Sequence, residues 1–142
     1  MLRKFRSPAA KLAALAVGAL VMTLGVSAAL ATSDSGTQNP DVTVSVSLSP
    51  DVVTVGDTVT ATASVTNNTN RRQKFVVKAT LTEPDGSSYS QSTTVRLDPG
   101  QTDSLTRSVV IDAGTPKGQY SLRVSARNNN GASSATATTT VQ

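Results

Sequence analysis

The sequence predicts an all-β fold, an immunoglobulin-like antiparallel β-sandwich of seven to eight strands, on three observations. Apolar residues alternate with Ser and Thr through most of residues 42–141, and a period of two is typical of antiparallel strands that keep one face toward solvent. Clusters of Gly, Pro, Asn and Asp interrupt the alternation at regular intervals, as turns between strands do. After Ala31 no stretch has the helical period of apolar residues.

The alternation also defines the strands in chain order, each with its apolar residues directed inward. A short edge segment is expected in the "VVTVGD" stretch before a turn at Gly56. The "EPDG" stretch has Pro and Gly at positions that favour a type I turn. The other expected strands cover residues 42–48, 58–66, 74–82, 87–97, 103–112, 118–128 and 133–141.

Two positions fit the inward pattern less well than the rest. Tyr89 falls on the inward face of a strand whose alternation is weak, and packing within the strand is its expected role. Arg107 interrupts an inward face that Leu105, Val109 and Ile111 define. We therefore expect a bulge or an exposed strand end at Arg107.

The first 31 residues have the pattern of a secretory signal peptide. Four basic residues precede an apolar and small-residue run, which is expected to form a hydrophobic helix. The run ends in Ala29-Leu30-Ala31, a suitable cleavage site. The sequence thus divides into a signal peptide (1–31), a flexible linker (32–41) and a β-sandwich domain (42–142). The alternative is an uncleaved helix that crosses a membrane, because the run is about long enough to span a bilayer. Contact with a membrane is expected only in that case.

Export with cleavage predicts a mature N-terminus at Thr32. The intact mass of protein recovered from the medium should then correspond to residues 32–142. Recovery of the full-length chain from the membrane fraction alone would contradict this prediction.

Charge and composition exclude several classes of function. The net charge of +4 comes entirely from the predicted signal peptide, because residues 32–142 contain equal numbers of basic and acidic residues. A folded domain that binds nucleic acid should carry a basic excess, so nucleic acid is not an expected partner. Without His or Cys, the chain has no Ser–His, Cys–His or Cys/His metal constellation. We expect no enzyme activity, no cofactor and no metal.

Scattered residues leave only weak candidates for calcium and glycan sites. Asp98 and Asp103 are the nearest candidate for a calcium site, but they lack the further clustered oxygens that calcium needs. Asn67 begins a formal "NNT" glycosylation sequon. Most acidic residues lie one per turn, where Asp side chains bond nearby backbone N–H groups.

Three segments carry a resemblance to a known family. The stretches "SPDVVTVGDTVTATASVTNNT", "RLDPGQTDSLTRSVVI" and "GTPKGQYSLRVSARNNNGAS" resemble successive blocks of bacterial immunoglobulin-like domains of the CARDB type (cell-adhesion-related domain in bacteria). The resemblance covers nearly all of residues 42–141. The resemblance is specific for the fold but not for the function, because such domains occur in many surface and secreted proteins and share no catalytic residues.

One tyrosine matches a structural feature of immunoglobulin-like sandwiches. There, a Tyr near the start of the penultimate strand packs inward and its hydroxyl bonds to backbone a few residues upstream. Tyr120 follows the "TPKG" corner and begins an inward-facing set of residues. We therefore expect Tyr120 to be a buried structural residue.

Basic residues on two strands form the candidate binding site. In an immunoglobulin-like sandwich the strands at residues 74–82 and 118–127 should be adjacent and antiparallel. Pairing is then expected to place Lys74 near Arg127 and Lys78 near Arg123, all four on the solvent face. The hypothesis is an anionic partner, a cell-wall polymer or an extracellular protein, and the alternative is a solvated face whose charge prevents aggregation.

The functional expectation is a secreted or cell-envelope, non-enzymatic binding or adhesion module. Two alternatives remain open. One is a structural spacer domain tethered by the uncleaved N-terminal helix. The other is a proteinase inhibitor that presents the 67–73 loop, which contains Arg71 and Arg72.

Overall fold

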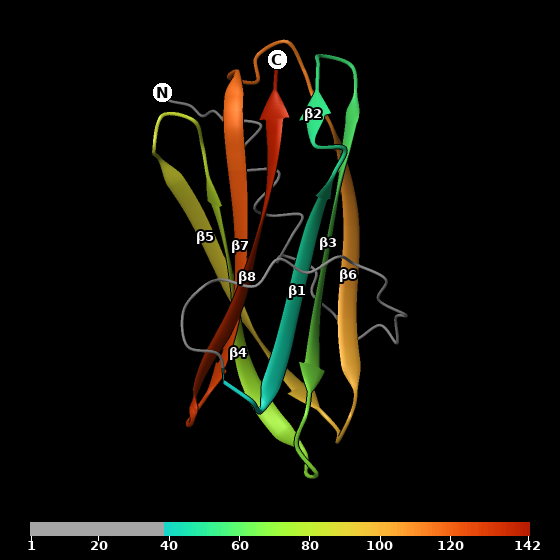
Figure 1. The fold of residues 1–142 in the computed structure, drawn as a ribbon, viewed down its shortest axis with the longest axis vertical. Coiled ribbons are helices and arrows are strands. Elements are labelled where there is room, and N and C mark those ends of the chain that lie inside the picture. Colours follow the sequence, from blue (N-terminus) through green and yellow to red (C-terminus); the bar gives the residue numbers. More distant parts are fainter. Residues whose placement is uncertain (1–38) are drawn as a thin grey trace, which may run out of the picture.

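The computed structural model describes residues 39–142, which form eight β-strands. Figure 1 shows the strands running along the long axis of the molecule in two layers. The predicted hydrophobic helix at the N-terminus lies outside the described residues. Within the described part, no helix is long and apolar enough to span a membrane. The strands are β1 (Val42–Ser49), β2 (Val52–Val53), β3 (Thr58–Asn67), β4 (Gln73–Thr82), β5 (Ser88–Leu97), β6 (Thr102–Val110), β7 (Gly118–Asn128) and β8 (Gly131–Val141).

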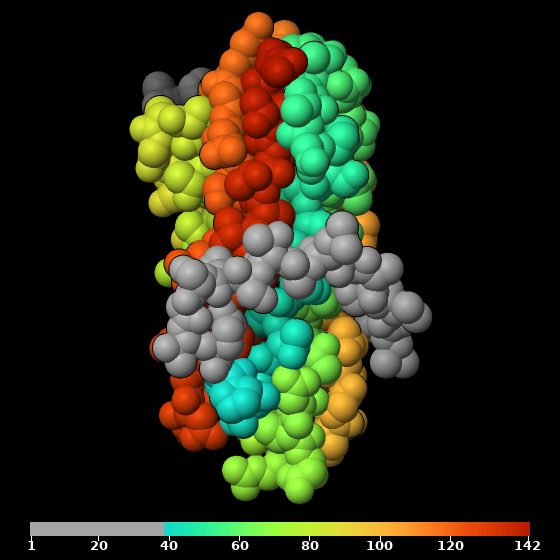
Figure 2. Space-filling view, viewed as in Figure 1, coloured from blue at the N-terminus to red at the C-terminus, as the bar shows by residue number. Residues whose placement is uncertain are grey.

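The strands form a three-stranded sheet of order β1-β3-β6 and a five-stranded sheet of order β2-β8-β7-β4-β5. All neighbouring strands pair antiparallel, except that β2 pairs parallel with β8. Figure 2 shows atoms of β8, in red, directly beside the blue-green atoms of the β2 region at one end of the molecule. The predicted all-β sandwich is confirmed, and so is the short edge segment before Gly56.

The core lies between the two sheets and contains the apolar residues that the alternation directs inward. Phe75, Leu81, Leu97 and Leu122 are at most 1% exposed. Because successive side chains of a strand point to opposite faces, one set is directed into the core and the other toward the outer face of the sheet. The predicted inward face is therefore correct for most positions.

Two inward positions on the edge strands are exposed. Tyr89 pairs with the buried Leu81, yet it is 37% exposed, whereas the inward residues at the other end of edge strand β5 are buried. Arg107 pairs with Ala61 on edge strand β6, and the β3–β6 register passes through it without interruption. The prediction of a bulge at Arg107 is therefore wrong, and its alternative, an exposed strand end, is correct, because residues 106–108 and 110 at the end of β6 are exposed.

The corner before β7 is fixed by Tyr120 and Gly118. Tyr120 is fully buried, and its hydroxyl donates a hydrogen bond of 2.6 Å to the carbonyl oxygen of Pro116. Burial, together with the nearby Glu83 and Asp85 carboxylates, raises the pKa of Tyr120 to about 12. Gly118 has φ of 129°, and a Cβ there would lie 2.6 Å from Cβ of Pro84, so only glycine fits. Tyr120 thus has the buried position and the backbone hydrogen bond that the sequence predicted.

Two buried asparagines connect segments that are distant in the sequence. Asn67 Nδ2 donates to the carbonyl oxygens of Arg71, Leu97 and Asp98, and its Oδ1 accepts from Thr69. These bonds join the end of β3 to the turn between β5 and β6.

Asn39 connects the start of the described chain to the β7–β8 hairpin. It is 5% exposed, and its Nδ2 donates to Asn128 Oδ1 and to the Gly131 carbonyl oxygen. Its backbone N–H donates to Ser133. Residues 39–41 of the predicted linker thus contact the sandwich directly.

Candidate functional site

The outer faces of the two sheets differ sharply in chemistry. Every outward position of β1, β3 and β6 is Ser or Thr except Val110. Hydroxyl pairs bond across these strands, as between Thr66 and Thr102 at 2.7 Å and between Thr60 and Ser108 at 2.9 Å. This face carries no charge. The charged residues of the described strands lie mainly on the outer face of the other sheet.

Five basic side chains form that second surface, which we call the basic face. β4, β5, β7 and β8 contain no Asp or Glu, so no acid offsets these cations within the sheet. All five are exposed and belong to the outward sets of their strands. The basic face consists of Lys74 and Lys78 on β4, Arg96 on β5, and Arg123 and Arg127 on β7.

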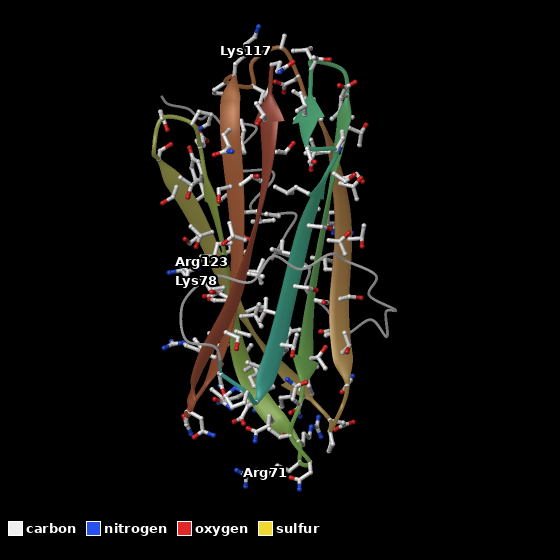
Figure 3. The ribbon with its side chains drawn as sticks, in the orientation of Figure 1. Arg71, Lys78, Lys117 and Arg123 are labelled. Carbon is white, nitrogen blue, oxygen red and sulfur yellow. The ribbon has the colours of Figure 1, made fainter. Side chains whose placement is uncertain are left out.

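The four residues predicted from sequence lie on one face, but their expected pairing is wrong. β4 and β7 are adjacent and antiparallel as predicted, with Lys78 opposite Ser125 and Arg127 opposite Val76. The register thus differs by two residues from the predicted pairing of Lys78 with Arg123. Like charges directly opposite one another destabilise a sheet, and the observed register avoids such pairs between β4 and β7. Figure 3 shows Lys78 and Arg123 projecting from the same side of the sheet, near its middle.

Arg96 is a member of the basic face that the sequence analysis missed. It lies directly opposite Lys74 in the β4–β5 hairpin. The available signal was the "EPDG" turn combined with the alternation, because the apolar residues of both strands face inward together only if one extra residue follows this turn. Arg96 brings a second cation to the level of Lys74.

Two depressions flank Lys74 at the end of the sheet where β4 begins. One, of ≈ 510 Å³, is lined by Arg71, Lys74, Arg127 and residues 128–130. The other, of ≈ 500 Å³, is lined by Arg72, Gln73, Lys74 and Arg96. Figure 3 places Arg71 at the tip of the molecule. With Arg71 and Arg72, seven of the nine Lys and Arg residues in the described chain belong to this surface or its rim.

Acidic groups near this end are held in turns and loops. Arg72 Nε lies 3.6 Å from Asp98 Oδ1, with both side chains 68% exposed; such an exposed ion pair contributes little stability. Hydrogen bonds from Asn130 and Asn128 lower the pKa of Asp41, and Arg71 adds to this effect. Asp41 thus stays ionised and contacts two asparagines that line the first depression.

The structure also locates the remaining candidates from sequence. Asp98 is exposed, whereas Asp103 is 1% exposed and lies on the inner face of β6. Within residues 39–142 no three acidic, His or Cys side chains gather where they could hold a metal ion. Asn67 is fully buried, so the folded domain has no room for a glycan there. The 67–73 loop is a short connection held by the Asn67 hydrogen bonds.

Several solved structures share this fold. The alkylpurine DNA glycosylase AlkC of Pseudomonas fluorescens matches with a TM-score of 0.56 and 16% sequence identity. The match covers 72% of this chain and 30% of that protein. The chain has a TM-score of 0.54 and 14% identity with a β-glucosidase of Erythrobacter marinus, covering 71% and 15% of the two chains. The chain therefore spans under a third of each of these proteins.

A third structure matches along nearly its whole length. The CARDB domain of a Pyrococcus furiosus protein, solved in complex with di-metal ions, has a TM-score of 0.50 and 22% identity. The match covers 74% of this chain and 97% of that domain. The resemblance to CARDB domains seen in the sequence is confirmed at the level of the fold.

The family comparison agrees with the structural one. No curated protein matches the chain significantly in sequence. The family model of the NPCBM-associated, NEW3 domain of alpha-galactosidase matches residues 53–129, which is more than half of the chain. This segment runs from β2 to the end of β7 and includes every residue of the basic face. The chain therefore belongs to the NPCBM-associated, NEW3 domain family.

Proposed function

We propose that this protein is a non-catalytic binding module of the cell envelope or the extracellular space that binds an anionic partner through the basic face. The observation that carries the proposal is the charge of one sheet surface, which has five cations and no acid on its four long strands. The family, the fold and the predicted signal peptide support an accessory role outside the cytoplasm.

The arrangement of these charges supports binding over simple solubility. Residues 39–142 contain nine basic and eight acidic residues, so the domain is nearly neutral as a whole. A domain that needed charge only for solubility would gain it from a net excess spread over its surface. Here the cations gather on one sheet and along two depressions. A surface of one sign attracts and orients an oppositely charged partner.

Sedimentation with purified cell-wall material tests the proposal. The protein should sediment with the wall at low salt and remain soluble at high salt, because exposed charges are screened. Changing Lys74, Lys78, Arg123 and Arg127 together to Ser should abolish sedimentation. A matched control changes Arg107 and Lys117, which lie outside the basic face, to Ser and should leave sedimentation nearly unchanged.

Equal sedimentation of the wild type and the four-residue variant would contradict a role for the basic face. No sedimentation of either protein would favour a spacer function. Inhibition of trypsin by the 67–73 loop remains a separate prediction from sequence, and a standard inhibition assay checks it.

A further inference from the structure

The observed register arranges the charges of the basic face as a single zigzag row. Antiparallel pairing places Arg123 opposite Thr80, Lys78 opposite Ser125, and Arg127 opposite Val76. At successive two-residue steps along β4, from Thr80 toward Lys74, the cation is contributed alternately by β7 and by β4. Their order is Arg123, Lys78, Arg127 and Lys74, and Arg96 lies beside Lys74 at the end of the row.

The strand geometry sets the spacing of this row. A rise of 3.3–3.4 Å per residue gives about 6.7 Å along the strand axis for each two-residue step. The three steps from Arg123 to Lys74 therefore cover roughly 20 Å. Neighbouring strands lie about 4.8 Å apart, so a narrow single chain laid along the row reaches cations on both sides.

An extended phosphodiester chain has a matching charge repeat. The three backbone bonds of an amino-acid residue span at most about 3.3–3.6 Å, so six single bonds span roughly 7 Å. Six bonds separate successive phosphorus atoms when a three-carbon polyol links them. In an inorganic polyphosphate two bonds separate them, which gives roughly 2.4 Å by the same scale. Of these two spacings, only the repeat of roughly 7 Å places one phosphate at each cation of the row.

We propose that the basic face binds an extended polyol phosphate whose phosphates are separated by three carbons, one phosphate at each step of the zigzag row. The inference rests on the proposed function of this face and names its ligand class. Arg and Lys both bind phosphate oxygens by charge-assisted hydrogen bonds. The two depressions beside Lys74 lie at the end of the row, where the bound polyol phosphate could extend beyond it.

The aromatic residues distinguish this ligand from single-stranded nucleic acid. A nucleic-acid backbone also has six bonds between phosphorus atoms, but its binding sites use aromatic side chains on which bases stack. In the described chain Phe75 and Tyr120 are fully buried, and Tyr89 is 37% exposed. Tyr89 belongs to the inner set of β5, opposite Leu81, and not to the basic face. A chain without bases suits this surface better.

A charge-conserving exchange tests the spacing directly. Changing Lys78→Thr together with Thr80→Lys moves one cation to the level of Arg123 and leaves a gap in the row, with no change in net charge. Thr80 Oγ1 pairs with Ser90 at the surface, and urea unfolding verifies that the variant remains folded. Arg107→Thr together with Thr106→Arg is the matched control, because it also moves one exposed cation without changing the net charge, but on β6, outside the basic face.

The probe is a 1,3-linked glycerol phosphate oligomer, and its affinity for the purified protein is measured by calorimetry or fluorescence titration. The exchange variant should bind it about tenfold more weakly, equivalent to about 1.4 kcal/mol. The control exchange on β6 should bind like the wild type. Inorganic polyphosphate of equal charge should bind the wild type and the exchange variant alike. Four phosphate contacts predict a slope of about −2.8 for log affinity against log salt, at about 0.7 per contact.

The outcomes separate this inference from the proposed function. Equal, salt-sensitive binding of the glycerol phosphate oligomer to the wild type and the exchange variant would overturn the spacing inference and leave the anionic partner in place. Binding of a single-stranded oligonucleotide as tight as that of the glycerol phosphate oligomer would overturn the choice of ligand. Failure of the wild type to bind any of the three anionic probes would overturn the proposed function as well.

Discussion

Replacing Tyr120 by Ala is expected to lower the free energy of unfolding by roughly 3–5 kcal/mol, the range for removal of a large buried aromatic side chain. Tyr120 is the largest fully buried residue, and its hydroxyl bonds Pro116 at the corner before β7. The chain has no cysteine and so no disulfide to compensate. Urea unfolding measures the loss directly. An unchanged midpoint would mean that the ring contributes little to the core.

Tyr120→Phe separates the hydroxyl from the ring and should cost about 1 kcal/mol. The pKa of Tyr120 is raised from 10.0 to about 12 by burial, so the fold favours the neutral hydroxyl. The associated stability is complete below about pH 10 and is lost as the pH rises through about 12. Between these values the wild type should therefore lose stability more steeply than Tyr120→Phe. If the urea midpoints of the wild type and Tyr120→Phe fell equally with pH, the raised pKa of Tyr120 would be contradicted.

Replacing Asn67 by Ala is expected to cost roughly 1–3 kcal/mol, the cost of leaving a buried polar group without a partner, because the carbonyl oxygens of Arg71 and Asp98 keep other donors. The Asn67 amide satisfies the carbonyl oxygens of Arg71, Leu97 and Asp98, and the residue is fully buried. Thermal or urea unfolding measures the effect.

Asn68→Ala is the matched control for this prediction. Asn68 is adjacent in sequence but exposed, and its amide bonds Pro40 and Thr43 at the surface. It should cost no more than about 1 kcal/mol. Equal losses for the two variants would contradict a special role of Asn67 in joining β3 to the turn after β5.

Alternation in the sequence was sufficient to predict the strands and their faces, but not the register of β4 against β7. A slip of one residue would turn every side chain to the other face and is excluded by the pattern. A slip of two residues leaves all faces unchanged, so alternation cannot detect it. β5 and β6 lie between β4 and β7 in the chain, so no turn joins them to fix the pairing. The cations that were predicted to lie opposite one another are therefore staggered in the structure and form the zigzag row.

Burial depends on the neighbours of a strand, and this explains the other differences. Tyr89 has the correct face, but its strand is at the edge of the larger sheet. Asn67 resembles a loop residue in the polar "NNTNRRQ" stretch, yet it ends β3 and is buried by the turn after β5. No local pattern contains that contact, because its partners lie about thirty residues further along the chain.

The positions of Asn39 and Val141 determine how the domain would carry a mechanical load. In Figure 1 β1 begins at one end of the long axis, and β8 finishes at the opposite end. A force applied between these two ends acts along the strands, so it pulls β1 past β3 and β8 past β7. The hydrogen bonds of each ladder then share the load and must break together instead of opening one after another. The Asn39 bonds to the β7–β8 hairpin transfer part of that load to the second sheet.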